Sequence, residues 1–122
     1  MITTDWGNYE ETIIVMRIEG HWQTVDFDIH LAYLQQMVKS KSHPLCLMFD
    51  ARLAAPVPAA IVKRINAQLT DKQSQLERIV AIITEQQKHT LALISNFYPA
   101  LVTEVVVVDT VDDAYQLILA IA

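Results

Sequence analysis

Glycine is almost missing from this chain of 122 residues. Only Gly7 and Gly20 occur, so no glycine follows position 20. A Walker-type phosphate loop and a dinucleotide-binding fingerprint both require several glycines, because the backbone must come very close to the phosphates. The sequence therefore argues against both kinds of nucleotide site.

Metal ligands and cysteine pairs are also lacking. Cys46 is the only cysteine, so the chain cannot form an internal disulfide. A zinc site needs three or four ligands at short spacing, whereas His21, His30, His43 and His89 stand far apart. We expect no metal and no other cofactor.

No arrangement of catalytic residues is recognisable in the sequence. Each of the four serines falls in, or at the end of, a predicted helix, and none lies in a nucleophile elbow: Ser40, Ser42, Ser74 and Ser95. No acid–base pair has a spacing suited to proton transfer. We therefore expect that the protein is not an enzyme.

Charge and hydropathy argue against further classes. The nine basic residues are scattered and outnumbered by 14 acidic ones, which gives a net charge of -5, whereas nucleic-acid binding needs clustered Lys and Arg. Apolar runs such as Val105–Val108 are far too short to cross a bilayer. Asp5, Glu10 and Glu11 interrupt the apolar stretch that a signal peptide would need. We expect no nucleic-acid partner, no transmembrane segment and a cytoplasmic location.

The composition that remains is that of a single folded domain covering residues 1–122. Hydrophobic residues make up 52% of the chain and charged residues 19%, which is typical of a globular protein. This apolar content is more than one small core needs, and it suggests that some apolar side chains form a partner surface.

Strand-like and helix-like segments alternate along the chain. The order is a hairpin of residues 2–6 and 12–19 turning at Gly7, then helices that begin near Thr24, Pro58, Gln86 and Thr110, separated by strands at 45–49, 78–83 and 104–108. Residues 50–57 are expected to form a loop. Strict alternation predicts an α/β fold with a mostly parallel sheet of four to five strands, an N-terminal hairpin and four helices.

Trp22, Asp50 and Arg52 follow predicted strands, at the sheet edge where open α/β proteins bind ligands. Two interpretations of Trp22 remain open: it packs the helix entry onto the core, or it forms the wall of a pocket with Asp50 or Arg52 opposite. A phospho-acceptor role for Asp50 would require a lysine after the last strand, which is missing. Capping of the loop, or pairing with Arg52, is the favoured role of Asp50.

Three segments resemble the STAS domain, the fold of bacterial anti-sigma factor antagonists. Residues 14–20 (IVMRIEG) are similar to the first long strand of that family with its closing glycine. Residues 45–50 (LCLMFD) are similar to its central strand, which ends in Asp, and residues 104–114 (EVVVVDTVDDA) to its last strand and helix entry. The resemblance covers Thr12 to Ile121 and implies a STAS-like fold and a regulatory, protein-binding role.

One family feature is absent. The regulatory members carry a phosphorylatable serine at the start of the second helix, but residues 54–59 here are AAPVPA, and no hydroxyl side chain lies between Asp50 and Thr70. The chain therefore resembles a divergent member without the phosphoserine switch. The wider group to which it is similar also includes lipid-binding SEC14-type domains.

Two helices carry apolar residues outside their core-facing stripes. Ile29, Tyr33 and Met37 recur at intervals of four on the first helix, and Tyr115 and Leu119 do so on the last. Coverage by neighbouring helices and use as an oligomer or partner interface are equally favoured explanations.

These observations lead to two hypotheses for function. The first is a non-enzymatic STAS-like module that regulates a protein partner and forms a homodimer in which the surface residues make the contact. The alternative is a carrier of a lipid or another small apolar ligand, with a pocket near Trp22, Phe49 and the third helix. A cavity of several hundred Å³ beside Trp22 would favour the carrier, and a filled interior would favour the partner module.

Overall fold

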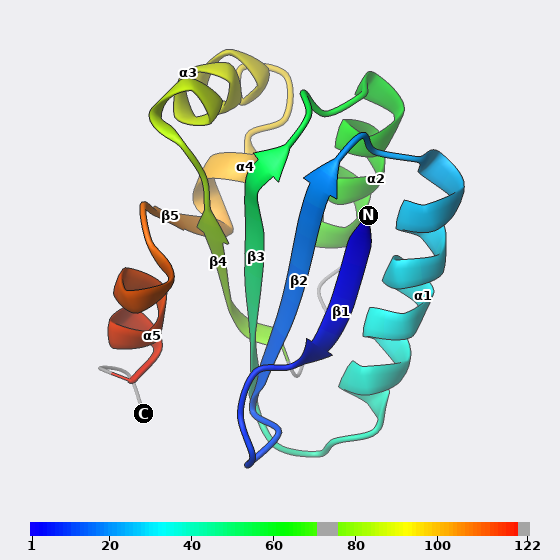
Figure 1. Cartoon of the computed structure of the whole chain (residues 1–122), viewed down its shortest axis with the longest axis vertical. Coiled ribbons are helices and arrows are strands. Elements are labelled where there is room, and N and C mark those ends of the chain that lie inside the picture. Colours follow the sequence, from blue (N-terminus) through cyan, green and yellow to red (C-terminus); the bar gives the residue numbers. More distant parts are fainter. Residues whose placement is uncertain (71–75, 120–122) are drawn as a thin grey trace.

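The five strands among the described residues lie side by side in the order in which they occur in the chain (Figure 1). The computed structural model describes residues 1–70 and 76–119. The strand β1 (Ile2–Trp6) runs antiparallel to β2 (Ile13–Gly20), while β3 (Leu45–Ala54), β4 (Leu76–Ile82) and β5 (Val105–Val108) continue the sheet parallel to β2. The predicted hairpin and mostly parallel sheet are confirmed.

Helices cover both faces of this sheet (Figure 1). The helices α1 (Thr24–Lys39) and α2 (Ala59–Thr70) lie on one face, and α5 (Val111–Leu119) lies on the other. Between β4 and β5 the chain forms α3 (Glu85–Ile94) and the short α4 (Ala100–Thr103), and α4 packs against α2. The described part of the chain thus has five helices, where four were predicted.

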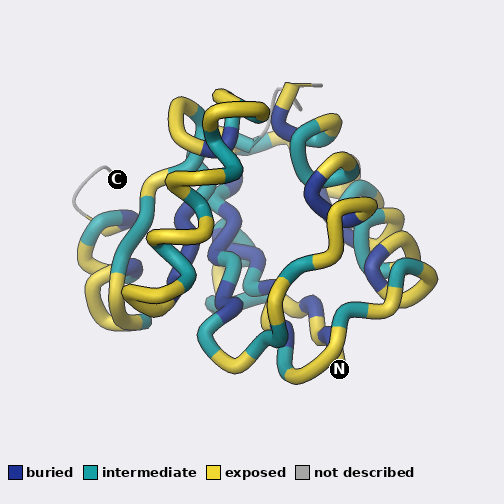
Figure 2. The backbone as a smooth tube through the Cα atoms, turned by 90° about the horizontal axis from the view of Figure 1, so that it is seen from above, coloured by how far each residue is buried: buried dark blue, intermediate teal, exposed yellow. Residues whose placement is uncertain are grey.

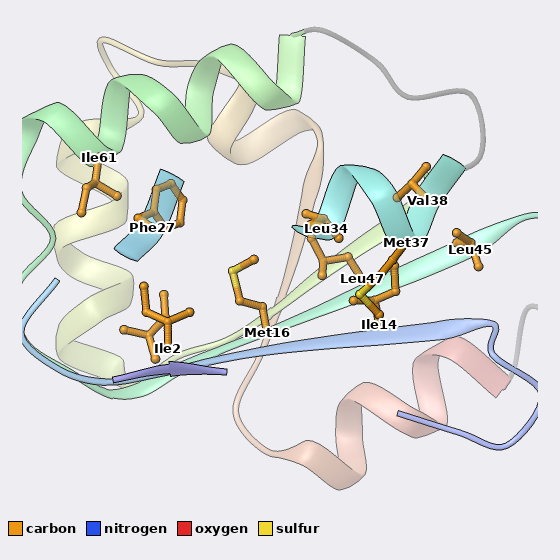
Figure 3. Packing of buried hydrophobic residues seen from close by; sticks show 11 residues of the cluster. Ile2, Ile14, Met16, Phe27, Leu34, Met37, Val38, Leu45, Leu47 and Ile61 are labelled. Carbon is orange, nitrogen blue, oxygen red and sulfur yellow. The ribbon is translucent and has the colours of Figure 1, made fainter. Parts of the chain in front are cut away.

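The core is built from the alternating side chains of the central strands. Leu45 and Leu47 of β3 pack toward α1, whereas Met48 packs toward α5, so this apolar strand is buried on both faces, as its lack of alternation predicted. Figure 3 shows side chains of α1 and of the strands meeting in the larger cluster. Seen from above, buried residues concentrate in the strands and exposed ones along the outer turns of the helices (Figure 2).

The prediction that a loop begins at Asp50 is wrong. The strand β3 continues to Ala54, because Leu53 and Ala54 pair with Glu19 and Gly20 of β2. The register shifts between Arg17 and Glu19, where β3 carries one extra residue. Such a bulge lets pairing resume after an irregularity, and it keeps residues 50–54 on the sheet.

The extra helix reflects a second difference from the sequence prediction, which had a single helix over residues 86–97 closed by Pro99. The helix α3 ends at Ile94, and Pro99 is the N-cap of α4. Proline suits the start of a helix, since its φ is already close to the helical value and its missing N–H needs no partner there.

The turn of the hairpin also differs from a tight turn at Gly7. Six residues connect β1 to β2, and Asn8 organises them: its Oδ1 accepts hydrogen bonds from the backbone N–H groups of Thr12 and Ile13, both at 3.0 Å. In residues 1–70 and 76–119, no helix is long and apolar enough to cross a membrane. Ile121, the end of the predicted last helix, lies outside the described residues.

Candidate ligand-binding site

A cavity of about 620 Å³ lies between the sheet and the helices on the side of α1 and α2. Its floor is formed by alternate residues of the four parallel strands, and its walls come from α1, α2, α3 and α4. The lining is overwhelmingly apolar and includes Met16, Phe27, Leu31, Leu34, Leu47, Phe49, Ala51, Ile65, Leu69, Ile79, Ala81, Ile83, Leu91, Ile94, Leu101 and Val105. This volume and this chemistry are typical of sites for small apolar molecules.

The cavity exists because short side chains face a loosely packed helix. Ala51 of β3 and Ala81 of β4 lie on the floor, where larger residues would fill the space. Above them, none of the residues Glu85–Ile94 of α3 is buried, and Leu91 and Ile94 on its inner side are only half-buried. Protein interiors are normally close-packed. The unfilled space next to α3 therefore shows that α3 is not packed as a helix of an ordinary core is.

Trp22 has both of the roles that were considered from the sequence, since it packs against the helix entry and also lines the cavity. Its ring packs edge-on against Phe27 of α1, with centroids 5.7 Å apart, and lies 6.0 Å from the ring of Phe49 on β3. Its Nε1 donates a hydrogen bond of 2.7 Å to the carbonyl oxygen of Ala55. Trp22 thereby fixes the entry of α1 and lines the cavity at the same time.

The start of α3, which contributes Thr84 and Gln87 to the cavity lining, is tied to the sheet. Thr84 and Gln87 form a capping box, in which the Thr84 side chain accepts from the Gln87 N–H and the Gln87 Oε1 accepts from the Thr84 N–H. The Gln87 Nε2 also donates to the carbonyl oxygen of Ala51, at 2.6 Å. One side chain therefore caps α3 and joins it to β3.

Asp50 pairs with Arg52, which confirms the role favoured from the sequence. The Arg52 Nε and Nη2 donate to the two carboxylate oxygens at 3.0 and 2.9 Å. Arg17, opposite Asp50 in the register of β2, adds a second ion pair at 3.6 Å. Arg52 is part of the cavity lining, together with Trp22, while Asp50 is not.

This cluster keeps Asp50 ionised despite its burial. Only 5% of the residue is exposed, and burial by itself raises the pKa of its carboxyl. The hydrogen bonds from the Arg52 side chain and backbone, together with the charges of Arg52 and Arg17, outweigh burial and hold the pKa of Asp50 below its ordinary value of 3.8.

The predicted surface residues divide into two groups. Ile29 and Tyr33 are exposed, at 59% and 49%, and so is Leu119. Tyr115 is half-buried, and its hydroxyl donates to the carbonyl oxygen of Gly7 at 3.1 Å. The prediction that Met37 lies on the surface is wrong.

Met37 is 8% exposed and packs in the core cluster of α1, where Figure 3 shows it among the core side chains. The reason is geometric. At 3.6 residues per turn, a row of residues spaced by four winds about 40° around the helix at each step. The row that is exposed at Ile29 therefore reaches the sheet by Met37.

Sequence reasoning named Trp22 and Arg52 but missed Ala51, Ala81 and the second arginine of the cluster. Alanines in strands read as ordinary core residues, and only the register shows that Ala51 and Ala81 lie on one side of neighbouring strands. Arg17 is 33 residues from Asp50 in the chain, so no local pattern could pair them.

Comparison with known proteins identifies the fold. No family model matches the sequence, and no curated protein matches it significantly. The structure is similar to the crystal structure of an uncharacterized protein of the DUF3478 family, with a SpoIIAA-like fold, from Shewanella loihica PV-4. The TM-score is 0.66 at 13% sequence identity, and the match covers 95% of this chain and 90% of that one. The chain therefore has a SpoIIAA-like, and thus STAS-like, α/β fold.

Proposed function

We propose that this domain is a non-catalytic carrier that binds a small apolar ligand, of the kind of a lipid chain, in the cavity between the sheet and α1, α2 and α3. The observation that carries the proposal is the cavity itself, with about 620 Å³ of space and an almost wholly apolar lining. Such a site buries most of a small ligand and needs few polar contacts.

The energetics of the lining support this choice over the partner module. Side chains that face unfilled space lack atoms to contact on one side and lose that dispersion energy. An apolar ligand restores those contacts and withdraws its own surface from water at roughly 25 cal/mol per Å². Leu91 and Ile94 of α3, which are only half-buried in the protein alone, gain most from such a ligand.

Fluorescence of Nile red, a neutral apolar dye, tests the proposal. We expect saturable enhancement with one dye per chain, since the dye would enter the cavity. The variant Ala81→Phe places a ring on the cavity floor and should weaken dye binding at least about tenfold, because it fills space that the dye needs.

The matched control is Ala92→Phe, which adds the same ring to the exposed outer side of α3 and should bind dye like the natural chain. Circular dichroism checks that both variants are folded. No enhancement with the natural chain, or equal binding by folded Ala81→Phe, would refute the proposal.

A second candidate is a regulatory protein-interaction module that associates through α1. It is favoured by a groove of about 510 Å³ between β1 and α1, whose lining includes the exposed Ile29 and Tyr33. The outer edge of β1 has no neighbouring strand among the described residues, and such edges offer backbone groups to a further strand. A homodimer through this surface is compatible with ligand binding, because the groove and the cavity share no lining residue.

A further inference from the structure

The helix α3 has apolar residues on two sides. Leu91 and Ile94 line the cavity, whereas Leu93 of the same helix is 70% exposed. Phe97, in the turn that follows α3, is 81% exposed, and its N–H donates to the carbonyl oxygen of Ile94 at 2.9 Å. A helix that covers a sheet needs only one apolar face, so packing onto the sheet does not account for Leu93 and Phe97.

The segment that carries these two residues has no charged side chain. Residues 89–103, which include the second half of α3 and all of α4, contain no Asp, Glu, Lys or Arg, although such residues make up 19% of the chain. Ala92 and Asn96, which precede Leu93 and Phe97, are also exposed. Charged groups around an interface orient protein partners, and this segment offers none.

The charges that flank this segment do not attract anionic groups. Lys88, which immediately precedes it, is paired with both Glu85 and Asp109, and these three side chains together carry a net charge of -1. Glu104, which immediately follows the segment, is acidic. Because like charges repel, the segment fits an uncharged apolar surface better than an anionic one.

The helix α3 is also the wall of the cavity that opens most easily. None of the residues Glu85–Ile94 is buried, and segments with few buried apolar contacts open at lower free energy than the core does. The ligand of a carrier with an apolar cavity dissolves far better in a membrane than in water. Contact of α3 with a bilayer therefore brings the cavity wall to the place where such a ligand is found.

From these observations we infer that the outer side of α3 docks on a neutral phospholipid bilayer, with Leu93 and Phe97 inserted into it. The inference rests on the proposed carrier function and names the source from which the ligand is taken up. Peripheral helices bind bilayers by burying apolar side chains at the boundary between headgroups and acyl chains. Two such side chains give weak and reversible attachment, as a carrier that must leave the membrane requires.

Flotation with vesicles of dioleoylphosphatidylcholine tests the inference. We expect the natural chain to float with the vesicles. Leu93→Ser and Phe97→Ser should each bind them about tenfold more weakly, because each variant removes an apolar side chain from the bilayer. Both variants should still bind Nile red in the absence of vesicles, since neither residue lines the cavity. Replacing a fifth of the lipid with phosphatidylserine should not strengthen binding.

Tyr9→Ser is the matched control. Tyr9 is 98% exposed and lies in the connection between β1 and β2, at the end of the sheet opposite α3 (Figure 1), so this variant should float like the natural chain. A natural chain that binds Nile red but does not float would overturn the inference and leave the carrier function standing.

Two further results would overturn the inference. One is that Phe97→Ser and Tyr9→Ser bind the vesicles equally well, because another part of the protein would then make the contact. The other is that the natural chain binds only vesicles that contain phosphatidylserine, since the attraction would then be electrostatic. A natural chain that binds no Nile red in the absence of vesicles would refute the carrier function, and the inference with it.

Discussion

At the scale of single residues, the group formed by Arg17, Asp50 and Arg52 stands out because it places a carboxylate in the sheet with two cations around it. Asp50 is almost fully buried, while both arginines are partly exposed. A buried charge is tolerated when it is paired and hydrogen-bonded. The two arginines therefore stabilise the charged form of Asp50. The contribution of Asp50 to the stability of the folded protein must then depend on pH.

We expect Asp50→Asn to lower the free energy of unfolding at pH 7 by about 1–3 kcal/mol, since it removes charge-assisted hydrogen bonds from a buried site. The pKa of Asp50 in the folded protein lies below the unfolded value of 3.8, so its contribution is complete above that pH. It is lost as the pH falls through the folded pKa. Urea denaturation at pH 7 and at several pH values below 3.8 should show the difference between the two proteins shrinking.

Asp28→Asn provides the comparison. Asp28 pairs with Arg64 at 2.7 Å, but the Asp28 side chain is 47% exposed, against 6% for that of Asp50. Such surface pairs contribute less than about 1 kcal/mol. Two results would contradict this account of the cluster. One is that Asp50→Asn lowers the free energy of unfolding no more than Asp28→Asn does. The other is that the difference between Asp50→Asn and the natural chain stays the same at acid pH.

At the scale of elements, α3 behaves as a cover over the cavity. It has no buried residue, and its start is fixed by Thr84 and by the Gln87 hydrogen bond to Ala51. Segments with few buried apolar contacts open at lower free energy than the core does. We therefore expect α3 to be the element that admits a ligand.

Thr84→Ala should loosen α3 by about 1 kcal/mol, because it removes the side chain that caps the helix. Amide hydrogen exchange should become faster in α3, with little change in β3 and β4. The corresponding variant Thr110→Ala removes the hydroxyl that accepts from the Asp113 N–H at the start of α5 and should accelerate exchange there instead. If amide hydrogen exchange in α3 were unchanged in Thr84→Ala, the Thr84 side chain would not be what stabilises α3 over the cavity.

Elements were predictable from the sequence where a local pattern determines them. Alternation of apolar strands with helical stripes was enough to predict the parallel sheet and its covering helices. The extension of β3 to Ala54 was not predictable, because it depends on a register with β2 that resumes after a bulge. The cavity was not predictable from a local pattern either, because it depends on which strand residues point toward α3.

At the scale of the whole molecule, the cavity and the exposed surface of α1 lie on different parts of the protein. Ligand binding and self-association can therefore be tested separately. The exposure of Ile29 and Tyr33 on α1 was predicted correctly from the helical pattern. The same prediction was wrong for Met37, because the turn of the helix brings that side chain to the core.

Light scattering tests the homodimer. We expect the natural chain to scatter with twice its monomer mass of 13.8 kDa, and Ile29→Asp to scatter as a monomer, because a charge would be buried in the apolar interface. Val25→Asp changes another exposed apolar residue of α1, which is not part of the groove lining, and should leave the dimer intact. A monomeric natural chain would refute the dimer.

The central claim is that an apolar ligand occupies the cavity, and methyl NMR of Ile, Leu and Val tests it most directly. On titration with hexadecan-1-ol, we expect the methyl signals of Ile79, Leu91 and Ile94, which line the cavity, to shift and saturate together. Those of Ile13 and Ile118, in the cluster under α5, should stay in place. Absence of any shift at saturating ligand, or shifts confined to methyl groups outside the cavity, would contradict the account.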